Sequence, residues 1–259
     1  MKNTFFLTIL LSAFLFSCSP GDSSANNSSA ADYFPLKLSN YWTYNVDKAG
    51  TIDHDSIFVA KDTTINTFVY KKIESKIAPI GFMSNSLNNN ELRIDGNKIL
   101  LTGKPNLNFV TNIGINLSLS DFVIFKSGAS ANEILSSVSG TIDQVYNSYP
   151  ITINYTLKSV AQGDLATYTS PNNATFNNVK AVNTILNIKV TTLLGPLPIT
   201  VLEPQDVIVS TQYFAKNIGV VHANTVYNYN LSTGLGSNLG IPENGNQIIN
   251  EFIDTYKVN

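Results

Sequence analysis

The sequence is poor in the residue types that build disulfides, metal centres and strongly charged surfaces. Its 259 residues include one cysteine, Cys18, so no disulfide can form within the chain. It has two histidines, His54 and His222, and one arginine, Arg93. Only 13% of the residues are charged, and the formal net charge is −2. No basic patch is visible, so we expect no nucleic-acid partner.

Common catalytic and metal-binding spacings are also missing. The sequence contains no H-E-x-x-H, C-x-x-C or G-x-S-x-G pattern. In a strand, Asp53 and Asp55 would share one face and His54 the other, which suits a solvated edge better than a metal site. His222 follows strand alternation and is expected to be a lone strand histidine. The glycine-rich stretch 234–240 has the wrong spacing for a dinucleotide loop. We therefore expect no enzyme, no metal and no cofactor.

What the sequence does have at its N-terminus is a targeting pattern. Lys2 precedes an apolar segment, residues 5–16, that is shorter than the roughly 20 residues of a transmembrane helix. The following "LFSC" (15–18) resembles a bacterial lipobox, in which the cysteine thiol receives the lipid. Residues 18–31 then lack any large apolar side chain, as linkers do. We predict a signal peptide at 1–17, lipidated Cys18 with a flexible tether at 18–31, and a β-rich domain at 32–259.

The residues after the cysteine indicate a destination. Ser19 stands where an aspartate would resemble an inner-membrane retention signal, which favours the outer membrane. Asp22 resembles part of the surface-export signals of Bacteroidota lipoproteins. The expected localisation is therefore the outer membrane, lipid-anchored, with exposure at the cell surface as a further hypothesis.

The domain itself has the pattern of an antiparallel β-protein. "ELRIDGNKILL" (91–101) predicts a hairpin with a type I′ turn at Asp95-Gly96. "PITINYTLKSV" (150–160) alternates between apolar and polar residues over its whole length. No β-α-β rhythm is visible. We predict an all-β fold with a single antiparallel β domain, a curved sheet or partly open barrel, and at most one or two short helices.

Two segments are ambiguous between helix and strand. "SANEILSS" (130–137) places Ser130 and Glu133 at capping-box spacing, which indicates one or two helical turns. The C-terminal "QIINEFIDTYKV" (247–258) fits a helical stripe and also one face of a strand. We favour a strand there, because its β-branched and aromatic content is high.

Three stretches resemble a family of Bacteroidota-type secreted lipoproteins, most of which have no assigned activity. They are "YFPLKLSNYWTYNV" (33–46), "TYTSPNNATFNNVKAV" (167–182) and "QYFAKNIGVV" (212–221), which are similar to the family patterns YFPLxxGNxWxY, vPaGtFxNv and YYAKGVGLV. The departures are at glycines: Ser39, Asn173 or Ala174, and Asn217 replace them. Asn217 can hold the same left-handed turn. The resemblance implies a β-rich envelope lipoprotein and transfers no catalytic residue.

Three hypotheses about function follow, in order of preference. The first is a non-enzymatic binding or interaction module of the cell envelope. It would be anchored to the membrane by its lipid and present a polar, Asn/Thr-rich sheet face to a glycan or an envelope protein. The alternative is a half-barrel carrier of a lipid or acyl chain in the periplasm, whose cavity segments 107–125 and 185–202 would line. The third is a hydrolase with an unrecognised site.

Overall fold

The protein is all-β, and its strands form one antiparallel sheet. The computed structural model describes residues 28–107, 115, 117–194, 196–232, 234, 236 and 240–259. In these residues there are twelve strands: β1 (Tyr41–Lys48), β2 (Thr51–Ile65), β3 (Phe68–Glu74), β4 (Glu91–Asp95), β5 (Lys98–Gly103), β6 (Leu119–Lys126), β7 (Ile134–Tyr146), β8 (Tyr149–Thr169), β9 (Thr175–Leu194), β10 (Leu197–Ala215), β11 (Gly219–Asn230) and β12 (Asn244–Lys257). Beside them lie a 3-10 turn, η1 (Ala30–Asp32), and a short helix, α1 (Phe82–Leu87). This confirms the predicted fold class.

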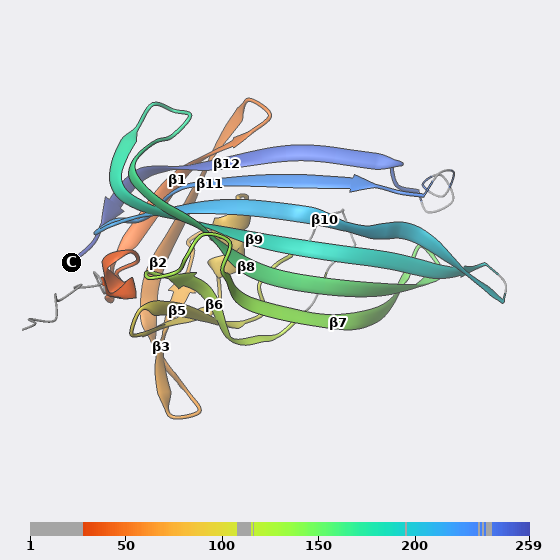
Figure 1. Ribbon diagram of the computed structural model, residues 1–259, viewed down its shortest axis with the longest axis horizontal. Coiled ribbons are helices and arrows are strands. Elements are labelled where there is room, and N and C mark those ends of the chain that lie inside the picture. Colours follow the sequence, from red (N-terminus) through yellow and green to blue (C-terminus); the bar gives the residue numbers. More distant parts are fainter. Residues whose placement is uncertain are drawn as a thin grey trace, which may run out of the picture.

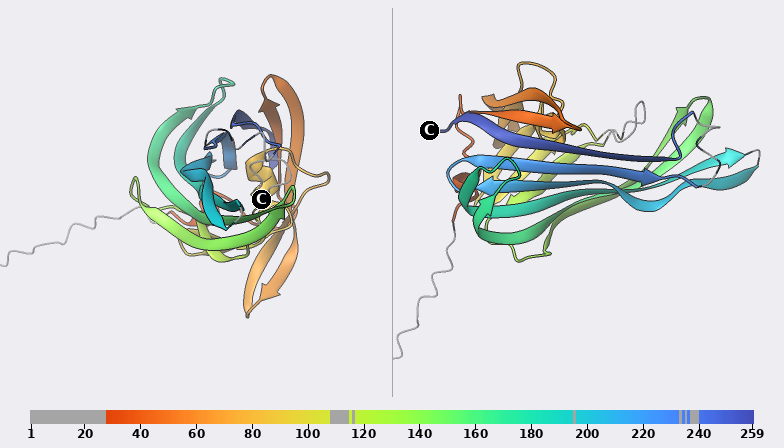
Figure 2. Two further views of the ribbon diagram at one scale, coloured as in Figure 1. Left: turned by 90° about the vertical axis from the view of Figure 1, so that its right-hand side faces the viewer. Right: turned by 90° about the horizontal axis from the view of Figure 1, so that it is seen from above.

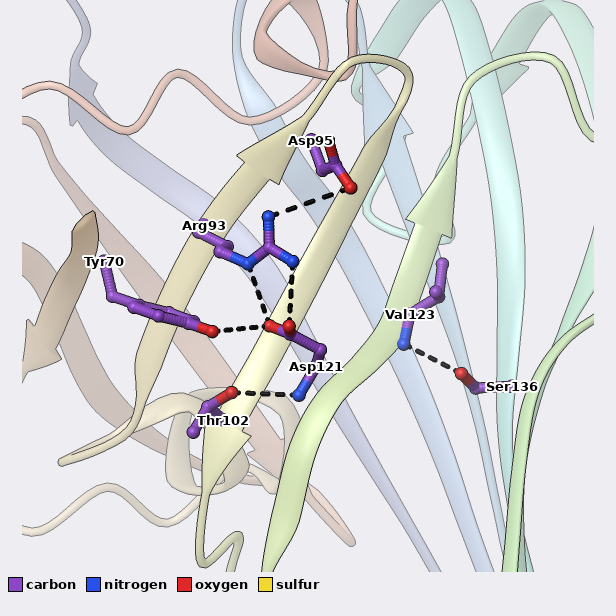
Figure 3. Close-up of polar contacts among 7 residues, drawn as sticks. All are labelled: Tyr70, Arg93, Asp95, Thr102, Asp121, Val123 and Ser136. Carbon is purple, nitrogen blue, oxygen red and sulfur yellow. Dashed lines mark hydrogen bonds and ion pairs between the residues drawn. The ribbon is translucent and has the colours of Figure 1, made fainter. Parts of the chain in front are cut away.

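The sheet curls into a nearly closed barrel (Figure 1; Figure 2). Its strand order is β6-β5-β4-β3-β2-β1-β12-β11-β10-β9-β8-β7, so β6 and β7 are the two edges. Where these edges meet, side chains take the place of a backbone ladder. The Val123 amide donates to Ser136 Oγ at 2.9 Å (Figure 3). Ser159 Oγ donates to the Val123 carbonyl. We call this contact the seam.

Local sequence patterns explain most of the strands. In β8, Ile151, Ile153 and Leu157 are buried while Asn154 between them is exposed, as the alternation predicts. The predicted hairpin of β4 and β5 is also confirmed, but the predicted type I′ turn is wrong. Asp95 pairs with Lys98, so the two turn residues are Gly96 and Asn97, and only Gly96 has positive φ, at 60°. Glycine at the first turn position is the type II′ arrangement, not type I′.

Neither ambiguous segment is helical: the first leads into β7 at Ile134, and the second is a strand. The C-terminal segment forms β12, which pairs with both β1 and β11, as we favoured. The helix predicted at 130–137 is wrong. Glu133 Oε2 does accept from the Ser130 amide at 3.1 Å, the contact expected of a capping box. The chain nevertheless continues directly into β7, because pairing with β8 along the whole strand outweighs one or two helical turns.

The molecule has two unlike ends. The turn η1 packs at the end that we call proximal, where the Ala30 amide donates to the Gly96 carbonyl at 3.3 Å. Long strands, among them β8, β9 and β10, continue away from it (Figure 1). β10 alone has 19 residues, or about 60 Å at about 3.3 Å per residue. We call residues 138–157 and 186–208 the distal extension, and the remaining sheet the proximal barrel.

The proximal barrel is filled by aromatic side chains of the first motif. Trp42 is fully buried, lies 4.6 Å from the Phe34 ring, and donates from Nε1 to the Ile218 carbonyl at 2.6 Å. Tyr44 is also fully buried, and its hydroxyl donates to the Val220 carbonyl at 3.0 Å. The motif residues therefore form core, as their size predicts.

At three positions where the resemblance places glycine, the backbone is left-handed. Ser39 has φ 68°, Asn173 has φ 67° and Asn217 has φ 63°. Asparagine tolerates this region better than most residues, so Asn173 and Asn217 can take the place of glycine. In the described part of the chain, no helix has the length and apolar character needed to cross a membrane.

Candidate functional site

The predicted lipidation site, Cys18, lies outside the described residues. The chain is first described at Ser28, whose carbonyl accepts a hydrogen bond from Ser127 Oγ. Ala30 is fully buried, so the η1 residues already pack on the barrel, although we placed the domain start at residue 32. The N-terminal segment therefore enters the fold at the proximal end.

The acidic residues around His54 do not form a solvated edge. Asp53 and Asp55 point to one face and His54 to the other, as predicted. However, β2 lies inside the sheet between β1 and β3, and Asp55 is buried. Its carboxylate accepts from the amides of Ile80 at 2.9 Å and Gly81 at 2.7 Å. Burial raises the pKa of Asp55. Its role is therefore to hold the chain that enters α1.

A second buried carboxylate, Glu251, was not anticipated from the sequence. It lies on β12 and accepts from the amides of Met83 at 2.8 Å and Ser84 at 2.9 Å. Complete burial raises its pKa to about 7. Alternation along β12 could have placed it on the inner face beside Ile249. Both carboxylates are occupied by backbone amides, and the described residues contain no group of three His, Cys, Asp or Glu side chains that could hold a metal.

His222 belongs to an aromatic stack on the outer face of the sheet. Its ring lies parallel to those of Phe252 at 4.7 Å and Tyr213 at 5.4 Å. Nδ1 is 2.6 Å from the Tyr168 hydroxyl, and Nε2 is 3.1 Å from Asn250 Oδ1. Burial lowers the pKa of His222, and the bond to Asn250 opposes this. Both nitrogens are used within the fold, so the residue stabilises the sheet.

Arg93 is the centre of a polar network on the outer face of β4 (Figure 3). It binds Asp121 through two nitrogens, at 2.9 and 2.8 Å, and Asp121 also accepts from the Tyr70 hydroxyl at 2.7 Å. The guanidinium lies 4.6 Å from the Phe68 ring. The bonds from Arg93 hold the pKa of the Asp121 carboxyl below its usual value. This network binds β3, β4 and β6 together.

The barrel interior holds a small apolar cavity of about 50 Å³. Phe34, Phe122 and Leu157 line it, with Gln212 among the few polar groups. Sites for small ligands are usually about 300–1,000 Å³. The carrier hypothesis requires a continuous apolar cavity of that order. In the described residues, segments 107–125 and 185–202 instead contribute buried side chains to the packed core, so the structure does not support it.

A larger hollow, the distal groove, lies at the tips of the long hairpins. Its volume is about 380 Å³, within the range of ligand sites. The described residues that line it are Asp143, Gln144, Val145, Pro150, Ile151, Thr152, Thr191, Thr192, Leu193 and Pro198. Val145 is 71% exposed and Leu193 is 52% exposed. Gln144 Nε2 is buried without a hydrogen-bond partner among the described residues. Large exposed aliphatic side chains beside an unsatisfied donor are features of a contact surface.

The outer face of the distal extension is polar, as the sequence predicts. Its hydroxyl and amide groups are mostly bonded to one another across β7 and β8. The pairs are Ser139 with Thr156 at 2.8 Å, Thr141 with Asn154 at 2.9 Å, and Thr152 with Asp143 at 2.6 Å. The face is therefore polar, but many of its side chains already form hydrogen bonds with one another. The sequence indicated this face, whereas the groove depends on how two distant hairpins meet.

Comparison with known proteins adds little beyond the fold. The chain is similar to a solved chain described as a candidate lipoprotein from Parabacteroides distasonis ATCC 8503. The TM-score is 0.40 and the identity 13%, over 87% of this chain and 98% of that chain. No protein-family model matches the chain, and no curated protein matches it. The function is therefore argued from the described residues.

Proposed function

We propose that the protein is a non-enzymatic binding module of the cell envelope, anchored through Cys18 in the outer membrane. It would contact a glycan or an envelope protein through the tips of its long hairpins. The observation that carries this proposal is the distal groove, which combines ligand-site volume with exposed aliphatic side chains. The tips project from a barrel whose own interior is packed.

The placement of the two ends supports the proposal. The N-terminal segment enters at the proximal end, and the groove lies at the other end of β10. A lipid on Cys18 would therefore hold the proximal end near the membrane. A molecule attached at one end and carrying its contact surface at the other can reach partners away from the bilayer.

The competing hypotheses have weaker support. The cavity of about 50 Å³ is far below the space that a carried lipid chain needs. For an enzyme, the titratable groups that the sequence singled out are used in the fold. Asp55 accepts backbone amides, and His222 is bonded on both ring nitrogens. A tethered binding module requires neither a large internal cavity nor a catalytic group.

Photo-crosslinking on intact cells tests the binding role and the anchor together. Benzoylphenylalanine would replace Leu197, which is 67% exposed at the tip, in the lipidated full-length protein. The matched control places it at Ile52, which is 55% exposed on β2 of the proximal barrel. We expect discrete adducts from position 197 that disappear with Leu193→Lys, and none from position 52.

The anchor is tested by membrane fractionation and protease treatment of intact cells. We expect the wild-type protein in the outer-membrane fraction and the Cys18→Ala protein released from membranes. Equal fractionation of the two proteins would refute the anchor. Absence of adducts at position 197, or equal adducts at both positions, would refute the tip as the binding surface.

A further inference from the structure

One edge of the sheet is left unpaired over most of its length. β7 is the last strand in the sheet order and pairs only with β8 in the described part of the chain. Its first residues meet β6 at the seam, where Ser136 bonds to Val123. From Val138 to Tyr146, no described group other than β8 and its side chains bonds to the strand. Within these nine residues, every second residue points its N–H and C=O away from β8, so the strand presents an open row of backbone donors and acceptors.

Among the residues that the structure describes, this edge lacks the features by which proteins protect open edges. Such protection usually comes from lysine, proline, a bulge or a covering segment. Residues 138–146 contain no lysine and no proline, and Asp143 is their one charged residue. The register with β8 is regular throughout this stretch. The edge has a regular register and one charge, and it is suited to receive another strand.

The free edge and the distal groove are adjacent. Asp143, Gln144 and Val145 belong to both. Gln144 lines the groove, and its buried Nε2 has no acceptor among the described residues, so a rotation of this side chain toward a ligand oxygen would satisfy it. The aliphatic surfaces of Leu193 and Pro198 lie along the same groove. An edge that offers backbone bonds thus continues into a groove that offers side-chain contacts.

From this combination we infer that the free edge of β7 binds an uncharged polypeptide segment in extended conformation. The segment adds to the sheet as a further strand, and its side chains enter the distal groove. This inference rests on the proposed binding function and names its partner class. Main-chain bonds supply affinity in such complexes, and pockets for alternate side chains supply specificity.

A polypeptide fits this surface better than a glycan does. The described groove residues include no aromatic ring on which a sugar could stack. The hydroxyls of the neighbouring outer face are largely bonded to one another, as in the pairs Ser139–Thr156 and Thr141–Asn154. The groups at this edge that remain without hydrogen-bond partners are backbone N–H and C=O groups. The single carboxylate, Asp143, disfavours an acidic segment at this position.

The test uses the peptide YPITINYTL, the sequence of residues 149–157, which pairs with residues 138–146 in the fold. Binding to the full-length lipidated protein in detergent is measured by fluorescence anisotropy. In two further peptides, every second backbone nitrogen is methylated, and the positions methylated in one peptide are those left unmethylated in the other. In a bound strand, the N–H groups of alternate residues face β7 and the others face away. The peptide cannot turn over to present the second set, because this would also exchange the side chains on its two faces.

We expect the unmodified peptide to bind, one methylated peptide to lose about tenfold or more in affinity, and the other to bind normally. Gln144→Leu should weaken binding, whereas the matched control Gln162→Leu, exposed at the proximal end of β8, should not. Circular dichroism of each variant verifies folding.

Three outcomes would overturn the inference: no binding of the peptide, equal binding of both methylated peptides, or binding of a neutral oligosaccharide panel at the groove instead. If tip crosslinks at position 197 persist in any of these cases, the proposed binding function survives and only the peptide class fails. If the crosslinks are also absent, both fail.

Discussion

The proximal barrel and the distal extension are built from the same sheet but differ in how their strands are enclosed. In the barrel, strands surround Trp42 and Tyr44, which are fully buried and bonded to backbone carbonyls. In the extension, the hairpins end with Val145 and Leu197 largely exposed, and β7 has one free edge. The core therefore runs from the barrel into the extension, where Ile153 and Ile188 are fully buried, while the hairpin ends carry side chains that folding leaves exposed.

The difference shows how one continuous sheet can serve two purposes. Backbone pairing continues from the barrel into the extension: β8 and β9 keep a regular register from Ile151 to Ala161, whereas β9 and β10 have three register shifts between Thr200 and Ile208. Buried side chains such as Ile153, Ile188 and Ile208 continue the core along these strands. A contact surface can then vary in side chains without loss of the fold.

The largest expected effect lies in the barrel core. Trp42→Ala removes a fully buried ring and leaves the Ile218 carbonyl without its donor. We expect a loss of about 3–5 kcal/mol in the free energy of unfolding. Leu197→Ala at the tip should change it by less than about 0.5 kcal/mol. Urea denaturation measures both, and similar losses would contradict the division into two regions.

The second effect is a pH dependence that belongs to the barrel alone. Burial raises the pKa of Glu251 from 4.5 to about 7. The folded state then binds more protons than the unfolded state between these values, so stability falls as pH rises through this window. The contribution is about 3 kcal/mol at about 1.4 kcal/mol per tenfold change.

Glu251→Gln should remove this slope. Asp55 and His222 are present in both proteins, but the Asp55 carboxylate also raises the pKa of Glu251, so the comparison reports Glu251 together with its coupling to Asp55. Unfolding by urea at several values between pH 4.5 and 8 gives the two curves. Parallel curves would show that Glu251 does not titrate in this window.

The smallest effect compares two serines on β7 itself. Ser136→Ala leaves the Val123 amide at the seam without its acceptor, which should cost about 1–2 kcal/mol. Ser139→Ala removes an exposed bond to Thr156 in the extension and should cost less than about 0.5 kcal/mol. Equal values from denaturation would mean that the seam does not contribute to closing the barrel.

Patterns that depend on neighbouring residues were readable from the sequence, and those that depend on sheet closure were not. Alternation in 150–160 predicted β8 and its polar face, because side-chain direction repeats every two residues. Trp42 and Tyr44 share one strand face by the same alternation, and their large side chains favour the buried positions that they occupy. The capping-box spacing at Ser130 gave a wrong prediction of helix, since the long-range pairing of β7 with β8 outweighs one local hydrogen bond.

For the same reason, only part of the candidate site could be predicted from the sequence. Thr152, Asn154 and Thr156 could be placed on an outer face from β8 alone. The groove brings together Gln144 and Leu193 from separate hairpins, and no local signal specifies that distance. Glu251 and α1 likewise meet across 168 positions of sequence.

The free tips make the length of a hairpin an adjustable dimension of the molecule. Adding one residue to each strand of the β9–β10 hairpin would move its tip outward by about 3.3 Å and exchange its inner and outer faces. Adding two to each strand would move it by about 7 Å and restore them. Chain insertions in steps of two residues per strand can therefore change how far the contact surface stands from the N-terminal attachment without redesign of the barrel.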